Sequence, residues 1–175
     1  VLWRRNFPAF VGKMLRKFRL GSMAYAPATL TVAFFEAMKG EAGTGKWLDV
    51  GPAVSEIRAV KSPAEVAAIA AALACAEGAF LASRRRWKIG MTETEIKNDL
   101  EWEMRKRGAE DAAFETIVAI GANASLPHAH AGTRKVQAGK MLLVDFGARV
   151  NRYNSDLTRT LWAGEIPKTW LRRYR

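Results

Sequence analysis

The amino-acid sequence predicts an α+β protein in which a small α/β segment precedes a larger region of two helices and a sheet. Two capping motifs open apolar helices in residues 61–110, and strand-like runs dominate the residues that follow. Hydrophobic residues make up 49% of the 175 residues, enough for a packed core. We therefore expect two regions, residues 1–60 and 61–175.

Residues 1–60 show the alternation of patterns that is typical of a small α/β unit. The expected elements, in order, are an amphipathic helix (1–18), a short strand (17–25), a helix that ends at Gly40 (28–39) and a second short strand (46–50). This segment looks like the end of a lobe rather than a whole one.

A long helix is expected to begin at "KSPAEV", where the second region starts. Ser62 is suited to the N-cap, Pro63 to the first helical position and Glu65 to the third. Apolar residues then recur every three or four positions and predict one buried stripe, formed by Val66, Ile69, Leu73, Ala76 and Phe80. The basic run at 84–86 is interpreted as a solvated helix end.

A second helix is expected in "GMTETEIKNDLEWEMRKRGAE". Thr92 and Glu95 form another capping box, and Gly108 ends the helix. Its buried face is expected to hold Ile96, Leu100 and Met104.

The remaining residues predict strands. Residues 114–120 read as one strand, and 141–150 and 153–162 as the two arms of a hairpin, with a short bridge at 135–138.

The net charge of +11 comes from the two ends of the chain. Residues 1–20 hold six basic residues and 166–175 hold four, with no acid in either segment. The residues between them carry a net charge of +1, which argues against a nucleic-acid partner. No apolar run reaches the length of a membrane span, and the single cysteine, Cys75, suits a core position in a reducing, cytoplasmic compartment.

The stretch "VDFGARVNRYNSD" places two acids in an apolar hairpin. A turn centred on Val150 and Asn151 would put Asp145 directly opposite Asp156, with Cβ atoms about 5 Å apart. Two like charges there are unfavourable unless they share a proton or hold a cation, and carboxylate oxygens suit hard divalent ions.

A shifted register leaves another interpretation open. One aspartate would then face solvent, and the other would pair with Arg149, Arg152 or Arg159.

Two histidines in "LPHAHAG" give three alternatives. His128 and His130 lie on one face of an extended segment and would chelate a metal there. Either ring also suits general acid–base chemistry near neutral pH, and a loop histidine bonded to backbone groups is the third alternative.

Several ordered motifs together resemble the pita-bread metallopeptidases, in the branch of the Xaa-Pro dipeptidases (prolidases) and aminopeptidase P. They are "EIRAVKSPAEVAAIAAALACAEGAF", "GMTETEI", "FETIVAIGANASLPHA" and "LLVDFGARVNRYNSDLTRT". The resemblance implies the N-terminal half of a pita-bread (creatinase/aminopeptidase-like) catalytic domain, preceded by a remnant of the N-terminal lobe. It also implies hydrolysis of the peptide bond before proline, on peptides with proline second, by a homodimeric full-length protein.

The resemblance also implies roles for three residues. Asp145 and Asp156 match two ligands of a centre of two divalent metal ions, with manganese expected and cobalt or zinc as alternatives. His128 matches a histidine that contacts substrate and assists proton transfer, whereas His130 matches no assigned residue.

The same resemblance implies that ligands are missing. Three further ligands of the family, one histidine and two glutamates, come from a C-terminal portion, and no histidine follows His130 here. We therefore expect a fragment that is inactive alone, binds metal weakly and associates through exposed apolar surface. The alternatives are a metal-free creatinase-like hydrolase and a catalytically dead module that binds nucleic acid or protein.

Overall fold

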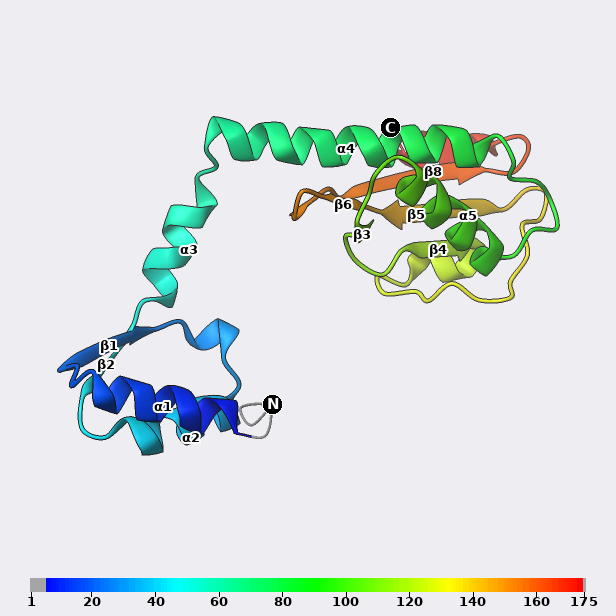
Figure 1. Ribbon diagram of the computed structural model, residues 1–175. Helices are drawn as coiled ribbons and strands as arrows, with labels where there is room; N and C mark the ends of the chain where they lie inside the picture. Colours follow the sequence, from blue (N-terminus) through cyan, green and yellow to red (C-terminus); the bar gives the residue numbers. More distant parts are fainter. Residues whose placement is uncertain (1–5, 175) are drawn as a thin grey trace. The chain divides into compact units, whose positions relative to one another are not determined.

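The computed structural model describes residues 6–174, and the chain divides into two compact units that meet between Lys61 and Ser62 (Figure 1). Each unit contains helices and strands, which confirms the α+β expectation.

The first unit is a small α/β arrangement. Its strands β1 (Ser22–Tyr25) and β2 (Lys46–Asp49) pair in parallel, and helices α1 (Phe7–Lys17) and α2 (Val32–Ala42) pack on each other. The backbones of the two helices approach closely at Gly12. Only glycine fits there, because a Cβ would overlap the carbonyl oxygen of Met38. Residues 1–5, which include Trp3 and Arg4 of the expected first helix, lie outside the described residues.

One prediction for the first unit was wrong, and one helix was missed. Helix α2 continues through Gly40 and ends at Ala42, because Gly43 takes the left-handed conformation (φ 83°) that stops it. Helix α3 (Gly51–Ala59) was not predicted, since none of its residues is buried and its sequence shows no apolar stripe.

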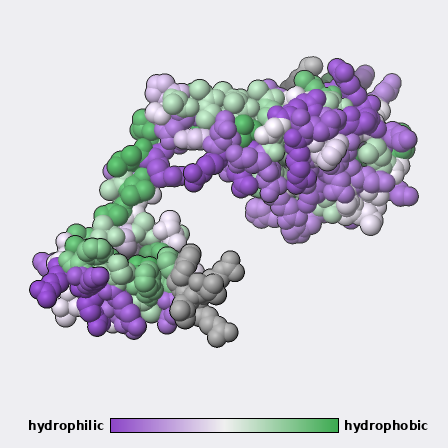
Figure 2. Space-filling view, in the orientation of Figure 1, coloured by the Kyte–Doolittle hydropathy of each residue, from purple (hydrophilic) through white to green (hydrophobic). Residues whose placement is uncertain are grey.

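Helix α4 (Pro63–Arg84) opens the second unit with the expected capping box of Ser62 and Glu65. Its predicted stripe is only half right: Ala76 and Phe80 are buried, but Val66 and Leu73 are exposed. The buried face is formed instead by Ala72, Cys75, Ala76, Ala79, Phe80 and Ser83. Because the helix is apolar on nearly every side, the pattern alone does not select a face, and Figure 2 shows apolar surface along its solvent side.

By length and composition α4 also resembles a membrane-spanning helix, and it is the one such helix within residues 6–174. Core helices of globular domains share these properties. The buried side of α4 packs against helix α5 (Glu93–Lys106) and the strands.

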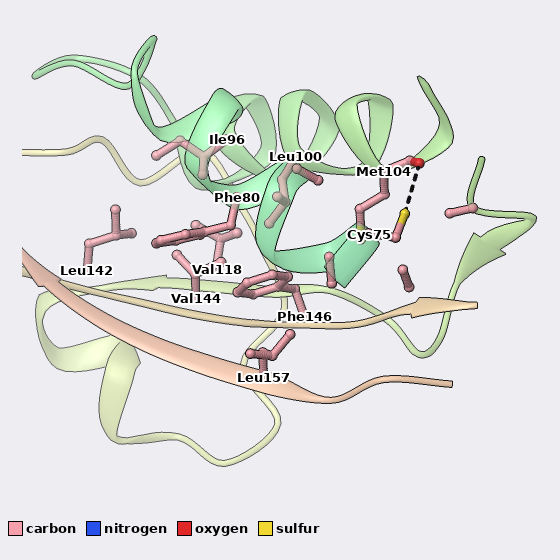
Figure 3. Packing of buried hydrophobic residues seen from close by; sticks show 14 of the residues in the cluster. Cys75, Phe80, Ile96, Leu100, Met104, Val118, Leu142, Val144, Phe146 and Leu157 are labelled. Carbon is pink, nitrogen blue, oxygen red and sulfur yellow. Dashed lines mark hydrogen bonds between the residues drawn. The ribbon is translucent and has the colours of Figure 1, made fainter. Parts of the chain in front are cut away.

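Helix α5 matches its prediction closely. Thr92 and Glu95 form the capping box, and Ile96, Leu100 and Met104 are almost fully buried. Figure 3 shows these side chains between the helices and the strands, and the rings of Phe80 and Phe146 stack at 5.3 Å. Cys75 is buried beside Met104, and this burial raises the pKa of its thiol, as suits an inert core cysteine.

Glu103 fixes the end of α5 to the segment that follows α4. Its nearly buried carboxylate accepts hydrogen bonds from Lys106 (3.0 Å), Arg107 and Arg86 (3.0 Å). The hydrogen bonds from Lys106 and then Arg107 lower the pKa of Glu103 to about 2. The basic run after α4 is thus partly an ion-pairing segment rather than a freely solvated end.

The strands of the second unit form two small antiparallel sheets. The central sheet has the order β4 (Ile117–Ile120), β5 (Met141–Phe146) and β8 (Leu157–Trp162), and the other has β3 (Asp111–Ala112), β6 (Ala148–Val150) and β7 (Tyr153–Asn154). An isolated bridge joins Thr92 to Lys135, at the place where a short bridge was expected. Leu142, Val144 and Phe146 of β5 are buried towards the helices (Figure 3). Because side chains alternate along a strand, Asp145 lies on the opposite, open face.

The predicted hairpin register was wrong by two residues. Val150 pairs with Tyr153, and Asp145 pairs with Thr158 instead of Asp156. The turn therefore consists of Asn151 and Arg152, which both take the left-handed conformation of a two-residue hairpin loop (φ 49° and 67°).

Replacing Arg152 with glycine is expected to stabilise the second unit by about 0.5–1 kcal/mol. The left-handed conformation costs a non-glycine residue about 1–2 kcal/mol, and the greater chain entropy of unfolded glycine offsets part of the gain. Urea unfolding measures the difference. Asn151→Gly is the matched control and should gain less, because asparagine already tolerates this conformation; a loss of stability in Arg152→Gly would contradict the turn assignment.

Candidate functional site

The open face of the central sheet carries a pocket that contains all three predicted site residues. The pocket has a volume of about 410 Å³, and Asp145, Asp156 and His128 line it. The remaining lining residues are Phe114, Glu115, Ile117, Pro127, Ala129 and His130. Residues that are far apart in the sequence are thus brought together by the pairing of β4 with β5 and of β5 with β8.

Asp145 sits in the middle of a cross-strand row, between Ile117 on β4 and Thr158 on β8. The hydroxyl of Thr158 donates a hydrogen bond of 2.7 Å to Oδ1 of Asp145. This bond orients the carboxylate and leaves its second oxygen available to the pocket. Thr158 was missed by the sequence analysis because the predicted register placed Asp156 in its position.

Asp156 reaches the same pocket from the break between β7 and β8. Its side chain is exposed, and within residues 6–174 it has no hydrogen-bond or ion-pair partner. Its position depends on the preceding residue: the buried Ser155 hydroxyl donates to the Ala72 carbonyl oxygen (3.1 Å) and accepts from the Ala148 amide (3.0 Å).

Within residues 6–174, no arginine pairs with either aspartate. Arg149 pairs with Glu110 and Asp111, and Arg159 pairs with Glu77 on α4. The alternative in which one aspartate is a structural ion-pair partner is therefore wrong. The apolar hairpin does not bury both carboxylates, because Asp145 is half-buried and Asp156 exposed.

The two histidines differ in their surroundings. His130 bonds through Nδ1 to Oε1 of Glu115 (3.2 Å), which also pairs with Lys97 (3.4 Å). The hydrogen bond from His130, followed by that from Lys97, lowers the pKa of Glu115. His128 is exposed to the pocket and has no hydrogen-bond partner among the described residues. Sequence reasoning missed Glu115, whose contacts join Lys97 on α5 to His130 in the loop.

The donor set suits part of a metal centre. Two carboxylates in one pocket provide the hard oxygen ligands that divalent cations bind. No group of three or more histidine, cysteine, aspartate or glutamate side chains with metal-binding geometry occurs in residues 6–174. The residues present therefore fit a metal ion, but as an incomplete ligand set.

The fold and this pocket together define the class of protein: half of a pita-bread peptidase domain. Residues 67–175 match metallopeptidase family M24, and the chain belongs to this family. Its structure is similar to that of an X-Pro aminopeptidase from Thermotoga maritima, with a TM-score of 0.88 and 33% identity, over 94% of this chain and 46% of that one. The prolidase from Pyrococcus furiosus matches with a TM-score of 0.83 and 27% identity, over 93% and 48% of the two chains.

A curated relative shows the same partial coverage. The Xaa-Pro dipeptidase of Pyrococcus horikoshii is 33% identical over 137 residues, which are 78% of this chain and 39% of that protein. The chain thus spans about two fifths of this relative's length. The expected family and the expected half-domain are confirmed.

Proposed function

We propose that this chain contributes the N-terminal half of the catalytic domain of a metal-dependent peptidase that cleaves the bond before proline. The supporting observation is the single pocket lined by Asp145, Asp156 and His128. The similar proteins are named Xaa-Pro dipeptidase, X-Pro aminopeptidase and prolidase, which supports this substrate class.

The proposal assigns Asp145 and Asp156 as metal ligands. Asp145 is held by Thr158 and presents its free oxygen to the pocket, and Asp156 is unpaired and accessible. When bound, a pair of divalent ions, which we expect to be manganese, would activate a water molecule as the nucleophile and polarise the scissile carbonyl group.

His128 is assigned the contact with substrate. Its ring faces the pocket without a protein partner, so it is free to donate a hydrogen bond to the oxygen that gains charge during cleavage. Residues 1–60 are assigned as the remnant of an N-terminal domain and 61–175 as the partial catalytic domain. We place the full-length protein in the cytoplasm as a homodimer.

Manganese titration tests the ligand assignment, because the chain contains only two histidines and both line the pocket. In the ¹⁵N-labelled chain, substoichiometric Mn²⁺ is expected to broaden the ring signals of His128 and His130 through its unpaired electrons. Asp145→Asn and Asp156→Asn should each reduce this broadening severalfold, because each removes a charged ligand.

The matched control is Asp111→Asn, an aspartate on β3 that does not line the pocket. It should leave the broadening unchanged. Broadening that persists in both pocket variants would mean that the histidines capture the ion by themselves, and the ligand assignment would be wrong.

A further inference from the structure

Glu93, the first residue of α5, is a buried charge that the proposed chemistry does not use. Only 1% of its surface is exposed, and within residues 6–174 no lysine, arginine or histidine pairs with it. A carboxylate in such a place is unfavourable unless hydrogen-bond donors surround it. The start of a helix favours a negative charge, but it does not explain why the side chain turns inward.

The two oxygens of Glu93 bind two separate segments. Oε1 accepts from the Ile120 amide (2.9 Å) and from the Asn123 side chain (3.3 Å), at the end of β4 and in the short helix η3 (Gly121–Ser125). Oε2 accepts from the Gly132 amide (3.0 Å). Residues 124–131, here called the histidine loop, lie between these attachment points and carry both histidines.

One carboxylate therefore joins the two ends of the histidine loop. The C-terminal end has additional bonds to α5, from the Thr94 amide and hydroxyl to the Gly132 carbonyl oxygen (3.1 and 3.0 Å). The described hydrogen bonds contain no second side chain that binds residues on both sides of the loop. Since His128 itself has no hydrogen-bond partner there, the position of its ring depends on how the loop ends are held.

We infer that Glu93 is a positioning residue that sets the place of His128 over the two aspartates. It does so by fixing both ends of the histidine loop to the start of α5. The inference rests on the proposed role of His128, because these hydrogen bonds of Glu93 matter for function only if the His128 ring must face the pocket. Glu93 does not touch the pocket, so its effect passes through the loop.

Glu93→Gln tests the inference, since an amide keeps one acceptor oxygen but turns an NH₂ group towards one of the two sets of N–H donors. One attachment of the loop is thereby lost while the helix start remains. Without metal, the ring signals of His128 and His130 should shift, and amide exchange in residues 126–134 should accelerate at least tenfold. The amides of Ile96, Leu100 and Met104 should keep their wild-type protection.

Glu95→Gln is the matched control. It removes an equal charge from the same helical turn, but within residues 6–174 the hydrogen bonds of the Glu95 side chain go to Thr92 alone. It should leave both ring signals unchanged. Unchanged ring signals in Glu93→Gln, or exchange that accelerates uniformly along α5, would overturn the inference and make Glu93 a general stability residue.

If Glu93→Gln does not fold, Glu93→Asp takes its place, because the shorter acid keeps the charge but cannot reach both segments. The same selective loosening is expected, and failure of both variants to fold would also overturn the inference. These measurements need no metal. If manganese does not broaden the ring signals of the wild-type chain, the proposed function is overturned, but the effect of the Glu93 variants on the histidine loop can still be measured.

Discussion

Replacing Gly147 with alanine is expected to destabilise the second unit by about 3 kcal/mol and to move Asp156 out of the pocket. A Cβ at this position would overlap the carbonyl oxygen of Ser155, and would lie 2.8 Å from its carbonyl carbon and 3.1 Å from Cβ of Ala113. Two of these atoms belong to the backbone, so no side-chain rotation relieves the clash, and overpacking of this kind costs about 1–3 kcal/mol.

The clash matters for the site because Ser155 precedes Asp156. If Ser155 shifts, its hydroxyl loses the bonds to Ala72 and Ala148 that fix this point of the chain. Urea unfolding and the manganese response of the histidine rings measure the two effects. Gly40→Ala is the control, since a Cβ there meets no atom within 4 Å, and alanine should be neutral or stabilising inside α2. Equal stability of Gly147→Ala and the wild-type chain would contradict the close approach.

The two long helices show what residue patterns predict. In α5, polar residues separate the apolar ones, so only one face is suited to burial, and Ile96, Leu100 and Met104 are buried as expected. In α4, alanines surround the helix, and the buried face is selected by partners far away in the sequence, such as Phe146. Periodicity therefore identified both helices but the buried face of only one.

Three residues named from the sequence line one pocket, but two of them were misplaced relative to each other. The two aspartates in the hairpin left a shared proton, a bound cation and a shifted register open, and the family resemblance then favoured metal ligands; both residues line the pocket. Their relation was misjudged because the turn was placed one residue too early. Asn151 and Arg152 form the turn, and an arginine is an unusual residue in a left-handed conformation.

The supporting residues were beyond sequence analysis for a different reason. Thr158, Glu115 and Glu93 act through contacts that join different strands, loops and helices. The capping-box spacing from Thr92 predicted the role of the exposed Glu95, but nothing in the residues around Glu93 indicates that it is buried. Burial of a charge is decided by tertiary structure, and only the fold reveals it.

The chain of 175 residues by itself is expected to show no turnover of an Xaa-Pro dipeptide above that of Mn²⁺ alone. Typical enzymes accelerate reactions at least about 10⁶-fold, so the expected deficit is of that order. The physical reason is the ligand set, because hard divalent cations take about six or more oxygen ligands. Of the three carboxylates that line the pocket, Glu115 pairs with Lys97 and His130. This leaves Asp145 and Asp156 as the ligands, beside a His128 that is unpaired among the described residues. A weakly held ion keeps most of its water and does not fix a substrate against the histidine.

The assay is release of proline with and without Mn²⁺, and Asp145→Asn serves as the internal control. A contaminating host peptidase would give activity that is equal in the two preparations, whereas activity of this chain would fall with the substitution. Turnover that depends on Mn²⁺ and is lost in Asp145→Asn would contradict the prediction. It would mean that the remaining metal ligands come from bound water or from association of two chains.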